Sequence, residues 1–171
     1  MLLHTCCAPC ATYPAKFFKE NGIDFTAFFM NPNIHPLSEQ VRRGEALWML
    51  ADREKFGLIY SNEFDQDAWE GAIGESSDRC KLCYEIRLYE TARQAKLRGF
   101  EGFSTTLLIS PYQDHDLIKQ IGFEAAEMLG LTFYYEDFRP HFREGQALAR
   151  EMGIYMQKYC GCVVSLAGKG R

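Results

Sequence analysis

The chain contains seven cysteines, and they fall into three short groups. The groups are a C-C-x-x-C pattern at Cys6, Cys7 and Cys10, a C-x-x-C pattern at Cys80 and Cys83, and a C-G-C pattern at Cys160 and Cys162. Thiolates at this spacing are ligands of zinc and of iron–sulfur clusters. A structural zinc site needs four ligands in two local pairs, so three groups favour an iron–sulfur cluster with a further function. A structural zinc site and a redox-active dithiol at Cys80 and Cys83 are the alternatives.

The composition is that of one folded domain, residues 1–171. Hydrophobic residues make up 47% and charged residues 25%, which excludes a disordered chain, a collagen-like repeat and a coiled coil. No apolar run reaches the roughly 18 residues that cross a bilayer, and the first residues lack the basic region of a signal peptide, so we expect a cytoplasmic protein. The net charge of −4 gives no general attraction to nucleic acid, so such binding requires a local basic patch.

Short apolar strands alternate with amphipathic helices along the chain. The strands are predicted at residues 2–5, 25–30, 58–60, 100–104 and 131–135. The helices are predicted before Gly22, over residues 36–56 with Leu37, Val41, Trp48 and Ala51 at helical spacing, through Leu82, Ile86 and Tyr89 up to Gly99, and over residues 114–129. This order predicts an α/β fold with a doubly wound, parallel, five-stranded sheet of Rossmann-like type. The stretch 63–77 is predicted to be an irregular surface excursion.

Parallel sheets bind ligands beyond the carboxyl ends of their strands. The first such loop holds Cys6, Cys7 and Cys10 and has no glycine, so it does not resemble a phosphate-binding turn and ATP is not expected there. The loop after the second strand offers Asn33 and His35, and the region after the fourth strand offers Tyr112, as candidates for substrate binding. Turn and helix-cap chemistry, or a structural role for the histidine, is the alternative for these positions.

Basic residues are scattered rather than clustered. We expect most of them to be solvated, and we single out Arg79 and Arg139 as candidates for substrate phosphate because they flank the predicted site loops. The set comprises Arg42, Arg43, Arg79, Arg87, Arg139, Arg143 and Lys158.

Together, several ordered motifs resemble the QueH-type epoxyqueuosine reductases over residues 2–165. They are His4-Thr5-Cys6-Cys7-Ala8-Pro9-Cys10, the Asn-Pro-Asn-Ile-His-Pro segment at 31–36, Arg79-Cys80-x-x-Cys83-Tyr84-x-x-Arg87-Leu88, Ser104-Thr105-Thr106-Leu107 and Tyr159-Cys160-Gly161-Cys162. The resemblance implies reduction of the epoxide of epoxyqueuosine at the wobble position of tRNA, the last step of queuosine biosynthesis, without cobalamin. It also implies an iron–sulfur protein with a fold akin to the adenine-nucleotide alpha-hydrolase group.

Removing an epoxide oxygen requires two electrons, two protons and a means of weakening a C–O bond. A [4Fe–4S] cluster can donate the electrons, and one additional iron with an open position can polarise the oxygen. We therefore expect all seven cysteines to bind metal, and we name Asp137 as a catalytic residue that completes the second site. The alternative is that Asp137 caps the following turn, and Asp65 and Asp78 are weaker candidates. The implied partners are tRNA carrying epoxyqueuosine and a low-potential electron donor.

Overall fold

The computed structural model describes residues 1–61, 65–73 and 78–167. Its centre is a sheet of five parallel strands in the order β3-β2-β1-β4-β5, which confirms the predicted α/β fold. The strands are β1 (Leu2–His4), β2 (Thr26–Phe29), β3 (Gly57–Tyr60), β4 (Gly102–Thr105) and β5 (Thr132–Phe133). The chain order reverses between β1 and β4, so the crevice beyond these two strands is the switch point where such sheets bind ligands.

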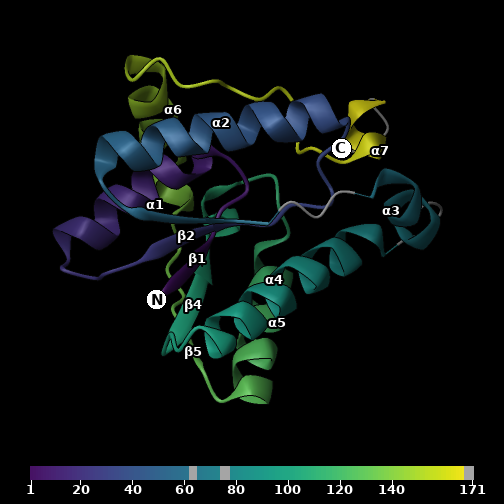
Figure 1. Ribbon diagram of the computed structural model, residues 1–171, viewed down its shortest axis with the longest axis horizontal. Helices are drawn as coiled ribbons and strands as arrows, with labels where there is room; N and C mark the ends of the chain where they lie inside the picture. The colour runs from purple at the N-terminus through teal and green to yellow at the C-terminus, as the bar shows by residue number, and fades with distance from the viewer. Residues whose placement is uncertain (62–64, 74–77, 168–171) are drawn as a thin grey trace.

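Helices cover both faces of the sheet (Figure 1). On one face lie α1 (Ala8–Glu20), α2 (Leu37–Glu54) and α6 (Phe142–Glu151), and on the other lie α4 (Arg79–Leu97) and α5 (His115–Leu129). The shorter helices are α3 (Gln66–Ile73), α7 (Val163–Leu166) and the 3-10 helices η1 (Thr106–Ile109) and η2 (Arg139–His141). No helix among the described residues is long and apolar enough to cross a membrane.

The predicted helix 36–56 forms as α2, but of the apolar stripe predicted from the sequence it buries only Ala51. Leu37, Val41 and Trp48 are 49%, 46% and 63% exposed, whereas Leu47 and Leu50 are fully buried. The opposite side of α2 also buries Arg43, which is 2% exposed. The expectation that this arginine is solvated is therefore wrong, and the same correction applies to Arg87 in α4, which is 3% exposed.

The stretch 63–77 is only partly irregular, because it contains the helix α3. Residues 62–64 and 74–77 lie outside the described residues. Helix α5 starts where the sequence predicts, since Asp114 accepts a hydrogen bond from the backbone N–H of Leu117 at 3.1 Å. A few residues earlier, Ser110 closes a local turn by accepting from the backbone N–H of Tyr112 at 3.3 Å.

Candidate metal centre

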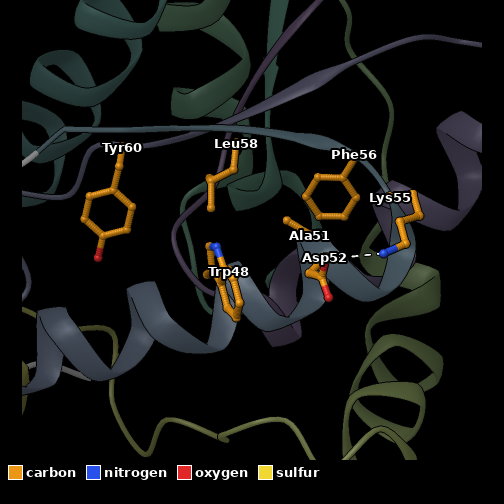
Figure 2. A pocket seen from close by; sticks show the side chains of 7 residues that line it. All are labelled: Trp48, Ala51, Asp52, Lys55, Phe56, Leu58 and Tyr60. Carbon is orange, nitrogen blue, oxygen red and sulfur yellow. Dashed lines mark hydrogen bonds and ion pairs between the residues drawn. The ribbon is translucent and has the colours of Figure 1, made fainter.

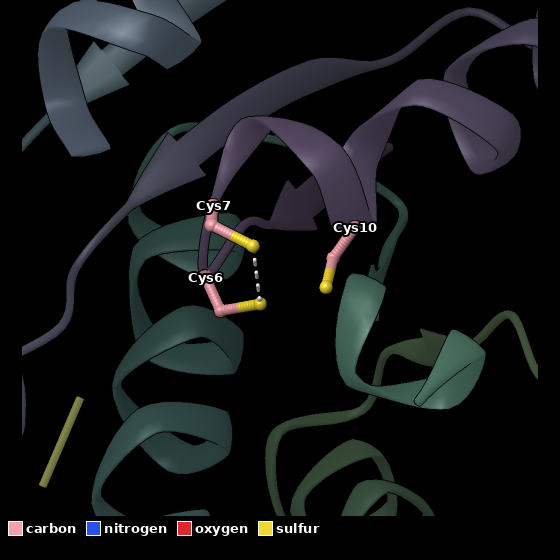
Figure 3. A group of neighbouring side chains, drawn as sticks. All are labelled: Cys6, Cys7 and Cys10. Carbon is pink, nitrogen blue, oxygen red and sulfur yellow. Dashed lines mark hydrogen bonds between the residues drawn. The ribbon is translucent and has the colours of Figure 1, made fainter. Parts of the chain in front are cut away.

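Three cysteine side chains meet beyond the carboxyl end of β1 (Figure 3). The sulfur atoms of Cys6, Cys7 and Cys10 all lie within 4.8 Å of one another. Figure 3 shows Cys10 in the first turn of α1 with its sulfur directed toward the other two. Cys7 and Cys10 are buried and Cys6 is partly exposed. Three soft sulfur donors this close together can bind one metal ion or one face of a metal cluster. We call these residues the thiol triad.

The local sequence explains how the triad forms. Cys7 is the N-cap of α1 in extended conformation and Pro9 lies in the first turn, where its missing N–H costs no helical hydrogen bond. Cys6 lies between this helix and the end of β4, because its backbone N–H donates to Thr106 Oγ1 at 3.2 Å. The triad is therefore held at the switch point between β1 and β4, as the position of the first loop predicts.

The three thiols differ in pKa. Hydrogen bonds from Cys10 and Cys7 hold the pKa of Cys6 well below its usual range, whereas burial raises that of Cys7. The pKa of Cys10 is also raised, chiefly because its thiol donates to Cys6. One thiolate that two thiols stabilise is a starting point for metal binding, which releases the remaining protons.

The second and third cysteine groups lie near enough for their charges to interact, although among the described residues their four sulfur atoms do not form a compact ligand group like the triad. Burial, together with the nearby charges of Cys160 and Cys162, raises the pKa of Cys83 to about 11. The same two thiols also act on Cys80, whose pKa burial raises as well. Cys80 and Cys160 are exposed, so this group is more open to solvent than the triad. All seven cysteines are free thiols.

A glycine makes the C-G-C turn possible. Gly161 has a φ of +122°, and a Cβ at this position would lie 2.9 Å from Cγ1 of Ile34 and 3.3 Å from Nη1 of Arg43. Both the backbone conformation and the close approach exclude a larger residue there. The turn between the two cysteines therefore requires a glycine.

Two further side chains hold the C-terminal segment in place, and no sequence motif indicated either of them. The side-chain amide of Gln157 donates to the sulfur of Cys7 at 2.8 Å. Arg43 donates to the backbone oxygens of Cys160 and Tyr159, at 2.9 Å each. Neither contact could be found from a sequence pattern. Gln157 lies outside any motif, and Arg43 lies among other charged residues in a helix.

Asp137 lies in a polar cluster after β5. Its carboxylate accepts two hydrogen bonds from the guanidinium of Arg139, at 2.6 and 2.8 Å, and this partner lowers the pKa of Asp137 to about 2. It also accepts from the backbone N–H of Arg139 at 3.1 Å, which is the turn-capping contact that the sequence left as the alternative. His115 Nε2 lies 3.9 Å from the same carboxylate. Among the described residues, Asp137 is not part of the metal-ligand group that the triad forms.

The remaining predicted substrate-binding residues differ in exposure. Tyr112 is 78% exposed, Arg139 is exposed and Arg79 is partly exposed, so these three side chains are available to a partner. Asn33 and His35 are 3% and 1% exposed, so both belong to the packed interior of their loop.

A separate hollow of about 430 Å³ lies between α2 and the edge strand β3 (Figure 2). Its lining includes the aromatic side chains of Trp48, Phe56 and Tyr60 and the ion pair of Asp52 with Lys55. No cysteine lines it, so it is not part of the thiol sites.

The sequence is similar over nearly its whole length to proteins with one shared description. Residues 1–168 match the family described as Epoxyqueuosine reductase QueH. A relative of the same name from Thermotoga maritima is 39% identical over 97% of this chain and 90% of its own length. Relatives of that name from Dehalococcoides mccartyi and Histophilus somni are 35% and 36% identical, over 96% and 97% of this chain and 91% and 72% of their own lengths. With the thiol triad at the switch point of the sheet, this similarity shows that the chain belongs to the QueH family of epoxyqueuosine reductases.

Proposed function

We propose that this protein reduces the epoxide of epoxyqueuosine in tRNA to the alkene of queuosine, with release of water. The observation that carries the proposal is the thiol triad, three sulfur atoms within 4.8 Å at the switch point, in a chain whose relatives are named for this reaction. The overall change consumes two electrons and two protons for each epoxide. The electrons come from a low-potential one-electron donor, which acts twice.

The donor set fits an iron–sulfur cluster. The triad supplies three soft ligands, and the group of Cys80, Cys83, Cys160 and Cys162 supplies four more. We propose that all seven bind metal, as a [4Fe–4S] cluster with one additional iron. When bound, such a centre stores electrons and provides a Lewis acid, which are the two properties that epoxide reduction needs. We propose that no cobalamin takes part.

The protein's own side chains prepare this centre. The burial of Cys7 and Cys10 keeps water from two of the sulfurs, and the amide of Gln157 donates to Cys7. Hydrogen bonds to a ligating sulfur stabilise its negative charge and shift the reduction potential. The exposed Cys80 and Cys160 leave the other group open to a large substrate.

Metal analysis tests the centre directly. We expect anaerobically purified protein to contain iron and acid-labile sulfide and to absorb broadly near about 400 nm, as thiolate-bound clusters do. The paired variants Cys7→Ser and Cys83→Ser separate the two groups, since each removes one sulfur with little change in volume. Loss of the absorption in both supports a centre that uses both groups. Colourless protein with one tightly held zinc would contradict the proposal and support a structural zinc module.

The reaction itself is tested with epoxyqueuosine-containing tRNA. The reconstituted protein, a low-potential reductant and no added cobalamin should give queuosine, detected by nucleoside mass spectrometry as the loss of one oxygen. Boiled protein and the Cys7→Ser variant are the controls. Unchanged epoxyqueuosine with a fully loaded centre would contradict the function.

We further propose that Asp137 completes the additional iron site. The low pKa of its carboxylate supports this role, because the group is ionised throughout the physiological range and so available as a hard ligand. It would exchange its contact with Arg139 for one with the metal. Loss of about one iron from Asp137→Asn, with the cluster spectrum intact, is the expected result. A variant with full iron content and full turnover would leave Asp137 only its role in capping the turn.

We propose that tRNA is held through Arg79, Tyr112 and Arg139, with phosphate contacts from the arginines and base stacking on the tyrosine. Asn33 and His35, also proposed for substrate binding, are buried, so their part would be to shape the loop beneath the substrate. A cytoplasmic location, where tRNA is found, completes the proposal.

A redox-active dithiol at Cys80 and Cys83 is less favoured. An attacking cysteine of such enzymes has a lowered pKa, whereas burial raises the pKa of both these thiols. Activity that survives complete iron chelation and a reversible disulfide between them would favour it again.

A further inference from the structure

The side chain of Arg43 is one of the most buried charged groups among the described residues, at 2% exposure in the middle of α2. Three atoms of its guanidinium group have defined acceptors. Nε donates to Glu39 Oε1 at 2.8 Å, Nη1 to the backbone oxygen of Cys160 at 2.9 Å and Nη2 to the backbone oxygen of Tyr159 at 2.9 Å. The guanidinium also lies 5.1 Å from the centre of the Tyr159 ring.

The segment that Arg43 contacts has no regular secondary structure of its own. Residues 154–162 run between α6 and α7 without a helix or strand, so their backbone oxygens need hydrogen-bond partners from outside a regular helix or sheet. Figure 1 shows this part of the chain and α7 beside the N-terminal end of α2. Only arginine combines a fixed charge with a planar fork of donors that reaches a carboxylate and two successive carbonyls at once.

Other contacts fix the same segment to the same surroundings. Tyr155 donates its hydroxyl to Glu39 Oε2 at 2.8 Å, so the carboxylate that pairs with Arg43 also holds the start of the segment. The hydroxyl of Tyr159 donates to the backbone oxygen of His35, and the backbone N–H of His35 donates to that of Gly161 at 2.9 Å. Arg43 therefore lies at the centre of a network that ends at the C-G-C turn.

We propose that Arg43 is a positioning residue that holds the Cys160–Cys162 turn in place, so that these two thiols stay beside Cys80 and Cys83 before any metal binds. The proposal deepens the proposed function, because that function needs the C-terminal cysteines as ligands. The contacts that carry it belong to the protein alone, so its test does not depend on turnover.

Trypsin provides a local test because Lys158 is exposed and immediately precedes Tyr159. In metal-free full-length protein we expect slow cleavage after Lys158. Arg43→Gln, which removes the charge and the fork, should accelerate this cleavage by about tenfold or more through local opening, and Arg43→Lys should restore part of the protection. Cleavage after Lys55, which is exposed at the end of α2, is the internal reference and should not change. Arg98→Gln, an exposed arginine at the end of α4 with the same loss of charge and no contact with this segment among the described residues, is the matched control.

Metal binding gives a second readout. Arg43→Gln should lose iron from the group that contains Cys160 and Cys162 and lower the yield of reconstituted centre, while Arg98→Gln should reconstitute as the parent does. Where Arg43→Gln fails to fold, Glu39→Gln replaces it. This variant keeps the arginine but weakens its anchor, and it should increase cleavage after Lys158 by a smaller factor.

Two outcomes would overturn the proposal. One is equal acceleration after Lys158 and Lys55, which would mean that Arg43 only supports global stability. The other is unchanged cleavage and iron content in both Arg43→Gln and Glu39→Gln. Failure of the proposed function can be told apart from these outcomes. A protein without epoxide reductase activity would still be cleaved slowly after Lys158, and Arg43→Gln would still be cleaved faster there.

Discussion

Cys6 is the residue at which the structure concentrates negative charge. Two neighbouring thiols donate to its sulfur and lower its pKa, while burial moves the pKa of Cys83 in the opposite direction, to about 11. The same side-chain type therefore has different chemistry at two positions of one chain. Cys6 therefore loses its proton more readily than Cys83, which favours the triad as the first point of metal binding.

The difference in pKa predicts a difference in alkylation of metal-free protein. Only the thiolate reacts, so the rate at Cys83 should fall about tenfold for each pH unit between 8 and 6, whereas the rate at Cys6 should fall less steeply because its pKa is lowered. Iodoacetamide labelling with peptide mass spectrometry measures both in one sample. Parallel pH profiles at the two cysteines would show that the triad does not stabilise a thiolate.

Gly161 is the second residue whose chemistry depends on its surroundings. Gly161→Ala forces an alanine to a φ of +122° and places a Cβ 2.9 Å from Ile34. We expect a loss of about 1–3 kcal/mol in the free energy of unfolding, with reduced iron content, because strain of this kind is relieved by moving the turn.

Gly153→Ala is the matched control for that variant. Its φ is +69°, but no atom lies within 4 Å of an added Cβ. It should therefore show only the smaller backbone cost, about 1 kcal/mol, and normal iron content. Denaturant unfolding and iron determination on both variants make the comparison, and equal effects would show that the contact with Ile34 is unimportant.

At the scale of elements, helix α4 connects the C-x-x-C pair to the loop before α5. Tyr84, directly after Cys83, donates its hydroxyl to Gln113 Oε1 at 2.8 Å and accepts from the backbone N–H of Asp114 at 3.2 Å. Burial raises the pKa of this tyrosine to about 12, so the hydroxyl stays protonated and keeps both roles. Asp114 is also the N-cap of α5, so one side chain fixes two helices relative to each other.

Tyr84→Phe removes both contacts and nothing else. We expect a loss of about 1 kcal/mol in the free energy of unfolding, since one net hydrogen bond contributes about that much, together with faster hydrogen exchange at the start of α5. Tyr89→Phe is the control on the same helix, because its hydroxyl makes no hydrogen bond among the described residues. A Tyr84→Phe variant as stable as Tyr89→Phe would show that α4 and α5 are held together by apolar packing alone.

At the scale of the whole molecule, the net charge of −4 opposes binding to a polyanion. A tRNA substrate must therefore be held by a few local contacts, and the exposed arginines at the carboxyl edge of the sheet are the candidates. Arg139 forms an ion pair with Asp137, and this negative partner reduces the attraction of Arg139 for phosphate. Weak binding with a modest dependence on salt follows from this distribution of charge.

Binding of the modified tRNA at increasing salt measures the number of phosphate contacts. We expect the slope of log affinity against log salt to be about −2 to −4, and each of Arg79→Gln and Arg139→Gln should make it less steep by up to about 1. Arg53→Gln, an exposed arginine in the last turn of α2, is the control and should leave the slope unchanged. A slope near zero would show that the substrate is not held through phosphates.

The sequence by itself determined the fold class, the strand positions to within two residues and the place of the first cysteine group. Alternating strand and helix patterns are local, and a loop directly after a strand must lie at the sheet's carboxyl edge, so these features follow from short stretches of chain. The family was recognisable because its motifs are short and ordered along the chain.

Only the tertiary structure decided which cysteines meet, which face of α2 is buried and what Arg43 does. The apolar residues Leu37, Val41 and Trp48 mark a helix, but their side chains are exposed, because the core-facing side of α2 also carries polar groups that the C-terminal segment satisfies. The sequence alone does not distinguish a buried arginine from an exposed one. Their difference arises from carbonyl oxygens more than a hundred residues away, which no local pattern encodes.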